Sequence, residues 1–337
     1  MSLFRTELRR LAKRRFARYM ALAGLLVLFA IAVGTFLTNE KVGPAQIAAA
    51  EQEAERAYQE NYESYEKSLQ ECERAKTSGT AEETGQWPED CSLIMPPPQE
   101  AFQAEWYMPP TFDFRNEFGE YIVAFAAILA LIAFAVGASF IGAEWASGGM
   151  MNLLLWRPQR LKVLLAKAGA MLAWLTGFTV VAAALWTAGF WVIAHYRGIT
   201  DGMTAGAWQS VVLAELRGLA LVLVAGLVGF ALASLGRHTA MALGGALGIL
   251  VVGQFGLGIV LEIAEVKFVE AWLLPTYALA WIQKQVVLQE WNCTPSPNVD
   301  CPQTMNIGWQ DSAVLFGVIV VLVFGAALWS MRRRDIT

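Results

Sequence analysis

Charged residues are scarce in this chain of 337 residues: Asp, Glu, Lys and Arg together make up 16% of it, against about 25% in a soluble domain. Hydrophobic residues make up 56%, and they occur in blocks too long for a globular core. This composition excludes a soluble enzyme, a nucleic-acid-binding protein and a disordered chain. It indicates an integral membrane protein that partners the lipid bilayer and no nucleic acid.

Catalytic signatures are also missing. The sequence has no Walker A motif, Gly-rich phosphate loop, HExxH or GxSxG. The two histidines, His195 and His238, lie far from the cysteines, so we expect no metal site. No carboxylate falls mid-bilayer, where proton- or sodium-coupled transporters place them. We therefore expect a non-catalytic membrane subunit without a cofactor, which would draw energy for uphill transport from another polypeptide.

Six hydrophobic segments are long enough to cross a bilayer, whose core takes about 20 helical residues. We predict an all-α integral membrane fold with six transmembrane helices: 20–38, 121–143, 168–194, 211–235, 239–261 and 312–331. If the N-terminus is cytoplasmic, the cytoplasmic segments carry 15 basic and 3 acidic residues, whereas the outer loop 39–118 carries 6 basic and 17 acidic residues. Because basic residues concentrate in cytoplasmic loops, we place both termini in the cytoplasm of a multi-pass plasma-membrane protein, in bacteria the inner membrane.

The N-terminal 19 residues include seven basic ones. A cleaved signal peptide would also show a basic start, an apolar run and small residues, here Ala48–Ala50. We favour retention, because the basic segment is long and the apolar run can span a bilayer. Phe4, Leu8 and Leu11 recur at helical spacing, which predicts an amphipathic elbow helix at the inner interface; a solvated basic tail is the alternative. Residues 1–38 would then form the elbow helix and the first span.

The loop 39–118 is long enough to fold outside the membrane. Its aromatic and apolar residues recur at intervals of three and four: Tyr58, Tyr62, Tyr65, Leu69 and Cys72. This spacing predicts an amphipathic helix in a small packed cap, which we favour over a solvated spacer.

All four cysteines, Cys72, Cys91, Cys293 and Cys301, lie in the two outer loops. An even number confined to the oxidising side predicts two disulfides. Three connectivities are possible, and we favour Cys72–Cys91 with Cys293–Cys301 because local closure is geometrically easiest.

The segment 262–311 mixes acidic and apolar stretches, and Pro275 interrupts it. Neither half spans a bilayer cleanly, so we predict a pair of re-entrant or interfacial helices. Residues 312–337 follow as the last span and a basic C-terminal tail.

Residues 119–261 hold spans two to five and one distinctive cytoplasmic segment at about 144–160. Gly148–Gly149 break the helix after Glu144, an apolar run follows, and Arg157, Pro158 and Arg160 return the chain to the next span. A short amphipathic helix here could receive force from a soluble partner, although an ordinary interfacial loop explains the pattern equally well.

This segment resembles the cytoplasmic loop of ABC type-2 exporter permeases, which has a Glu, a Gly turn, a Leu-rich run, Pro-x-Arg and a Lys. The matching residues are Glu144, Gly148, Leu153–Leu155, Pro158, Arg160 and Lys167. The basic elbow, the six spans, the double helix before the last span and the terminal Arg333-Arg334-Asp335 resemble that family as well. Gly149, Trp156 and the long loop 39–118 depart from its pattern.

The resemblance implies the permease subunit of an ATP-driven exporter for a lipid-like, amphipathic or drug-like substrate. Its partners would be two ABC ATPase subunits, which carry the ATP and Mg, and a second permease copy or a homologous permease. The coupling helix would contact the ATPase through Glu144, Gly148, Arg157, Pro158 and Arg160. Alternatives are a non-transporting anchor, immunity or sensory protein on the same fold, and a channel or secondary transporter.

Two further groups of residues carry predictions about assembly and substrate. Gly244-x-x-x-Gly248 has the spacing that lets helix backbones approach, so we predict contact between permease copies there; packing within one chain uses the same spacing. Trp174, Phe178 and Trp186 could line a path for an amphipathic substrate, although lipid-facing and packing roles account for such residues more often.

Overall fold

The computed structural model describes residues 3–78, 87–88, 90–156, 159–290 and 303–333. The chain forms two compact units, which we treat separately. The first unit, here called the bundle, comprises Met1–Val33, Phe114–Val192 and Thr200–Thr337. The second unit comprises Gly34–Asp113 and Ile193–Ile199.

Six helical segments are long and apolar enough to cross a membrane, and each contains one of the predicted spans. They are α2 (Arg15–Thr38), α5 (Phe114–Ala146), α7 (Arg160–Arg197), α8 (Ala205–Gly236), the continuous run of α9 (Thr239–Leu250), η4 (Val251–Gly256) and α10 (Leu257–Ile263), and α12 (Trp309–Arg333). The prediction of a helical membrane protein with six spans is therefore confirmed.

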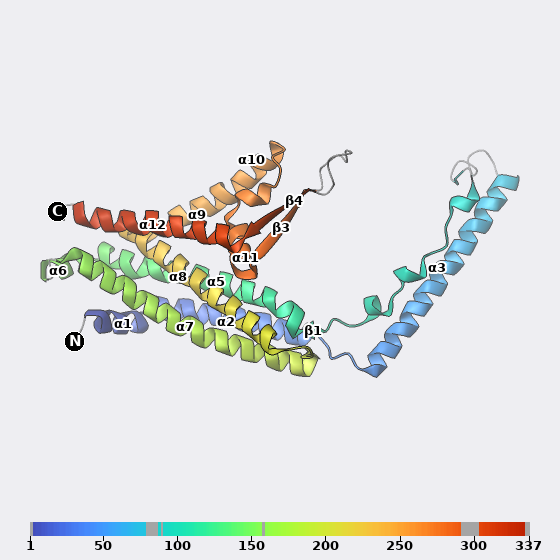
Figure 1. The fold of residues 1–337 in the computed structure, drawn as a ribbon, viewed down its shortest axis with the longest axis horizontal. Coiled ribbons are helices and arrows are strands. Elements are labelled where there is room, and N and C mark those ends of the chain that lie inside the picture. The colour runs from blue at the N-terminus through green and yellow to red at the C-terminus, as the bar shows by residue number, and fades with distance from the viewer. Residues whose placement is uncertain (1–2, 79–86, 89, 157–158, 291–302, 334–337) are drawn as a thin grey trace. The chain divides into compact units, whose positions relative to one another are not determined.

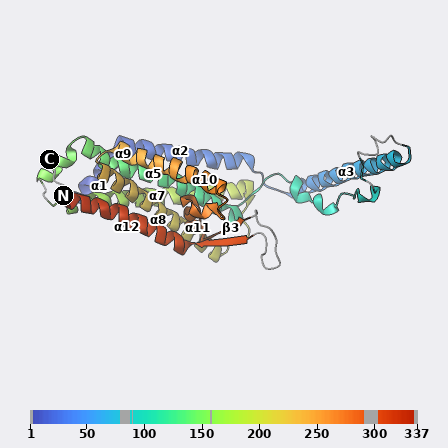
Figure 2. The ribbon, with the colours of Figure 1, turned by 90° about the horizontal axis from the view of Figure 1, so that it is seen from above.

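The centre of the bundle is the pair α5 and α8, and half of the most hydrophobic stretch of each is buried. A Cβ atom at Gly137 would collide with the backbone carbonyl of Gly226, and one at Gly229 with that of Phe134. Glycine is needed at these positions because the two backbones approach too closely for any side chain. Helices α2 and α12 lie on opposite sides of this pair (Figures 1 and 2).

The fifth span differs from this pair, because none of its most hydrophobic stretch is buried. A Cβ atom at Gly244, Gly245 or Gly248 would meet no atom of the described residues within 4 Å. Among the described residues, these glycines therefore take no part in close packing with another helix of the same chain, and contact with a second copy stays a prediction.

A short helix and a hairpin separate the fifth and sixth spans. The 3-10 turn η5 (Val269–Trp272) leads into α11 (Leu274–Gln283), and β3 (Gln285–Glu290) pairs antiparallel with β4 (Gln303–Gly308). Leu288 and Ile307 from the hairpin pack with Ala280 of α11 in a small core. The sequence predicts a pair of re-entrant or interfacial helices before the last span. The structure has α10 (Leu257–Ile263) and α11 (Leu274–Gln283) there, and their position relative to a membrane stays a prediction; the hairpin is a feature that the sequence analysis missed.

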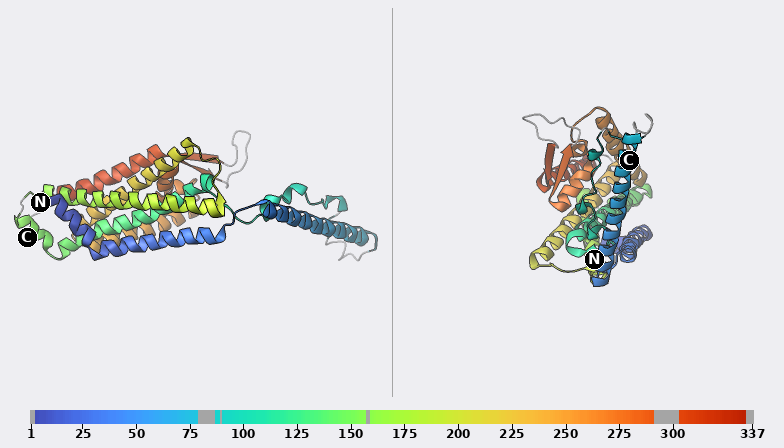
Figure 3. Two further views of the ribbon diagram at one scale, coloured as in Figure 1. Left: turned by 90° about the horizontal axis from the view of Figure 1, so that it is seen from below. Right: turned by 90° about the vertical axis from the view of Figure 1, so that its right-hand side faces the viewer.

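The bundle has one end at which three of its segments gather. Helix α1 (Leu3–Lys13), the short helix α6 (Gly149–Trp156) and the C-terminal end of α12 all lie there, as Figure 1 and the view from below in Figure 3 show. The first and last described helices thus reach the same side of the six spans. The position of α1 in a membrane interface stays a prediction.

The second unit is built on one long helix, α3 (Pro44–Ser78). The chain returns beside it through three 3-10 turns, η1 (Cys91–Leu93), η2 (Gln99–Ala101) and η3 (Ala104–Tyr107), to β1 (Phe112–Asp113), which pairs in parallel with β2 (Gly198–Ile199). The helix that the tyrosine spacing predicts is present. Among the described residues, its partner is this irregular return segment.

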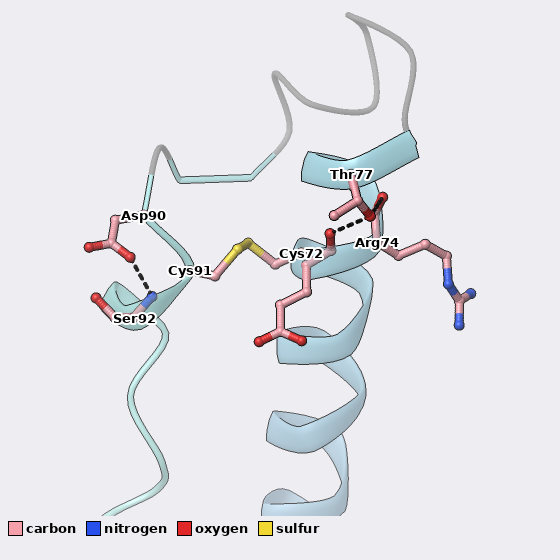
Figure 4. Close-up of a disulfide and its surroundings, with 7 residues drawn as sticks. Cys72, Arg74, Thr77, Asp90, Cys91 and Ser92 are labelled. Carbon is pink, nitrogen blue, oxygen red and sulfur yellow. Dashed lines mark hydrogen bonds between the residues drawn. A yellow bond between two sulfur atoms is a disulfide. The ribbon is translucent and has the colours of Figure 1, made fainter.

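A stripe of aromatic rings and a disulfide hold the return segment to α3. The ring of Tyr58 lies 6.0 Å from that of Tyr62 and 5.7 Å from that of Phe102 in the return segment. Cys72, fully buried, is joined to Cys91 (Figure 4). Cys293 and Cys301 lie outside the described residues, so their pairing stays a prediction.

Candidate functional site

The segment between α5 and α7 turns at Gly148, whose φ is +70°. Glycine adopts this left-handed conformation without steric cost, which is why α5 can end and α6 can begin within three residues. Helix α6 has eight residues, and α7 starts at Arg160. The result is a helical hairpin whose short connecting helix lies at the end of the bundle (Figure 1).

A network of buried charges closes the base of this hairpin. The Lys167 ammonium on α7 lies 2.7 Å from Oε2 of Glu7 on α1 and 2.7 Å from Oε2 of Glu144 on α5. The side chains of Lys167 and Glu7 are fully buried, and that of Glu144 is 22% exposed. We call Glu7, Glu144 and Lys167 the charge network.

The charge network ties together three helices that are distant in sequence. Buried charges are unfavourable unless they are paired, so neither carboxylate can leave Lys167 without a free-energy cost. Two arginines of the N-terminal segment surround the network. Arg10 lies 3.3 Å from Glu7, and Arg14 donates a 3.0 Å hydrogen bond to the carbonyl of Phe140.

Arg14 also interacts electrostatically with the Glu144 carboxylate. Burial lowers the pKa of Arg14, and the neighbouring Glu144 carboxylate opposes that shift. An arginine remains protonated over the whole physiological range in any case. The positive charge of Arg14 therefore adds to that of Lys167 at the end of α5.

Trp145, which follows Glu144 on α5, links this helix to the turn between α8 and α9. The guanidinium of Arg237 lies 5.0 Å from the centre of the Trp145 ring, a cation–π contact. A Cβ atom at Gly142 would lie 2.6 Å from the backbone nitrogen of Thr239. The end of α5 is thus held on one side by the charge network and on the other by the α8–α9 turn.

Helix α6 itself offers a surface. Met150 is fully buried, whereas Leu155 is 78% exposed and Asn152 is also exposed. Helix α6 therefore has one covered side and one exposed side, and partner contact through the exposed side stays a prediction.

The predicted coupling residues have separate places in this arrangement. The carboxylate of Glu144 is directed to Lys167, and Gly148 forms the turn. Arg160 begins α7. Arg157 and Pro158 lie outside the described residues. A role of these five residues in ATPase contact stays a prediction.

Glu7 is the residue that sequence reasoning missed. It is the single carboxylate in the first 19 residues and lies one turn from Leu11 on the apolar face of a basic helix. A carboxylate at such a position needs a buried cation. Its place on the apolar face was therefore the signal in the sequence that could have identified Glu7.

The predicted substrate-path residues lie on α7 and are partly or wholly covered. The rings of Trp174 and Phe178 are stacked at 5.4 Å. Trp186 is buried and packs against Phe190 at 4.5 Å and Phe125 at 5.8 Å. Their predicted contact with substrate is not tested by these packing distances and stays a prediction.

Among the described residues, no group of three His, Cys, Asp or Glu side chains could hold a metal ion. The α6 end is held together by the paired charges of Glu7, Glu144 and Lys167. The three residues of the charge network hold one another.

One family model matches this chain. It is described as ABC-2 family transporter protein, and the match covers residues 1–336. A comparison with curated proteins finds no match, and neither does a comparison with solved structures.

Proposed function

Since the chain belongs to the ABC-2 transporter family, and is thus the membrane permease of an ABC transporter, we propose that it exports a lipid-like, amphipathic or drug-like substrate. Separate ATPase subunits would bind ATP and Mg and supply the energy. This chain would form the path and would carry no catalytic residue of its own.

The observation that carries this proposal is the fixed hairpin around α6. A soluble ATPase can only shift a permease through a part that is both exposed and rigidly connected to the spans. Leu155 meets the first condition, since it is 78% exposed. The Glu144–Lys167 pair meets the second, since it joins the end of α5 to the start of α7 across the hairpin.

The proposed coupling step is a shift between two populations of the permease. When ATP binding closes the ATPase subunits, α6 is displaced with them. Because Lys167 also holds Glu7, the displacement is transmitted to α5, α7 and α1 together. ATP binding then favours one access state of the permease by its differential affinity for the two states.

We place α6 and both termini in the cytoplasm. The support is the charge asymmetry, with 15 basic and 3 acidic residues on the α6 side of the spans. The second unit would then lie outside, where the disulfide Cys72–Cys91 is stable.

A second permease copy would pack against the exposed face of the fifth span. Its support is that Gly244 and Gly248 face open space and that the most hydrophobic stretch of this span is unburied. Small residues at this spacing allow two helices to approach closely. The copies would then meet along α9.

The test replaces the exposed leucine of α6. In the Leu155→Asp variant, we expect co-purification of the ATPase subunit from native membranes to fall by about tenfold or more. Burial of a leucine side chain in the contact contributes about 2 kcal/mol, and this contribution is lost when a charged side chain takes its place. Leu93→Asp is the matched control, since Leu93 is a 64% exposed leucine of the second unit. Membrane insertion should be unchanged in both.

The proposal fails if no ATPase accompanies the wild-type chain. It also fails if Leu155→Asp retains the ATPase as well as the wild type does. Loss in both variants would equally contradict it, because the effect would then not depend on α6.

A further inference from the structure

A shallow hollow of about 450 Å³ lies on α1 and its junction with α2. It is lined by Thr6, Arg9, Arg10, Lys13 and Arg14. Four of these five residues are basic, and no carboxylate lines the hollow. Residues three and four apart on a helix share a face, so the sequence alone brings Thr6, Arg9, Arg10 and Lys13 together.

Two of the four basic side chains already have partners. Arg10 pairs with Glu7, and Arg14 donates to the Phe140 carbonyl. For Arg9 and Lys13, which are both exposed, the described part of the chain supplies no side-chain partner. Like charges one turn apart repel each other, so an anion in the hollow would relieve an unfavourable arrangement.

The position of the hollow indicates which class of anion it would bind. Arg15 begins α2, the first candidate span, directly after the last lining residue. The residues at the end of a span lie at the level of the lipid headgroups. Helix α1 is amphipathic, with Leu11 fully buried beneath its basic face, and such helices lie in the plane of the interface.

We propose that this hollow binds the phosphate of an anionic phospholipid headgroup. The guanidinium of Arg9 can hold two phosphate oxygens at once, and the Lys13 ammonium adds a point charge. The Thr6 hydroxyl is a further donor at the same face. A soluble anion would not need a site that begins where a membrane span begins.

The experiment measures which lipids the full-length protein retains. The protein is placed in nanodiscs that contain phosphatidylcholine and phosphatidylglycerol, and co-purified lipids are counted by native mass spectrometry. The test variant is Arg9→Gln with Lys13→Gln, because neither residue takes part in the charge network. The matched control is Arg5→Gln with Arg15→Gln, which removes two exposed charges beside the hollow but outside its lining.

We expect the wild-type protein to retain phosphatidylglycerol in preference to phosphatidylcholine. Loss of the charge-assisted hydrogen bonds that Arg9 and Lys13 would donate to the phosphate should lower that preference on the order of tenfold or more. The control should keep the wild-type preference. Arg9→Lys with Lys13→Arg, which conserves both charges, should keep it as well, and this variant guards against misfolding as the cause.

Three results would overturn the proposal. The first is equal retention of both lipids by the wild-type protein. The second is an equal loss in the test and control variants, which would indicate diffuse charge and no site. The third is displacement of phosphatidylglycerol by millimolar inorganic phosphate, which would show that free phosphate, or a soluble anion like it, is the ligand.

Discussion

The α6 end of the bundle and the second unit are both held by links between side chains, but the chemistry of the links differs. In the bundle, Lys167 holds Glu7 and Glu144 by charge. In the second unit, a disulfide joins Cys72 to Cys91. The charged link can exchange partners without a chemical reaction, whereas the disulfide opens only on reduction or thiol exchange.

This difference fits what each region is proposed to do. A part that transmits force must be firm within each state yet able to change partners between states, and an ion network allows both. The second unit has a long helix with few buried apolar residues, so it needs help to remain packed. Variants that remove either the charge network or the disulfide alone should therefore affect one region and not the other.

The largest expected effect comes from Lys167→Met. This change leaves Glu7 and Glu144 without their shared cation, and removal of one partner from a buried ion network costs about 3–5 kcal/mol. The free energy of unfolding of the purified protein, measured in detergent by thermal or denaturant melting, should fall accordingly. Susceptibility of the second unit to protease should not change.

Two controls sharpen this prediction. Lys167→Arg keeps the charge and should lose less stability. The triple variant Glu7→Met, Glu144→Gln and Lys167→Met should recover much of the loss, because replacing a whole buried network is often nearly neutral. A triple variant as unstable as Lys167→Met would show that side-chain packing, and not charge, holds α1 to the hairpin.

The next effect in size comes from Cys72→Ser. The two cysteines are 19 residues apart in the sequence, and closing a loop of that length is worth about 3 kcal/mol in the chain-entropy model. We expect limited proteolysis to cut between α3 and η1 faster in the variant than in the wild type, with unchanged melting of the bundle. Reductant added to the wild-type protein should have the same result, and cleavage at the wild-type rate in either sample would contradict the prediction.

Much of the fold could be predicted because its signals are local. Long apolar runs mark the six spans, and the Tyr58–Tyr62–Tyr65 spacing marks α3. The β3–β4 hairpin was missed because each strand has six residues and weak alternation, and its pairing joins Gln285 with Gly308 across 23 positions. A contact of that kind depends on packing against α11, which no local pattern reports.

The site was predictable only in part, for a related reason. Glu144 and Lys167 flank a recognisable loop, so the sequence brings both to notice. Glu7 lies 160 residues from Lys167, and a lone carboxylate on a basic helix does not say which of many cations it meets. The choice is made by how α1 packs on α7, where Phe4 lies near Gly169.

The smallest expected effect concerns a charge in the second unit. The Asp90 carboxylate accepts a 2.9 Å hydrogen bond from the backbone N–H of Ser92, beside the disulfide (Figure 4). This bond lowers the pKa of Asp90 below its ordinary value of 3.8. A lowered folded-state pKa means that the stabilisation is complete above about pH 4 and is lost as the pH falls through the folded-state value. We therefore expect the hydrogen bond that holds η1 to weaken only below about pH 4.

Hydrogen exchange at the Ser92 amide should differ between wild type and Asp90→Ala at neutral pH, and the difference should shrink towards pH 3. Comparison of the two proteins at each pH removes the intrinsic pH dependence of exchange. A difference that stays constant from pH 6 to pH 3 would show that the charge of Asp90 does not stabilise this turn.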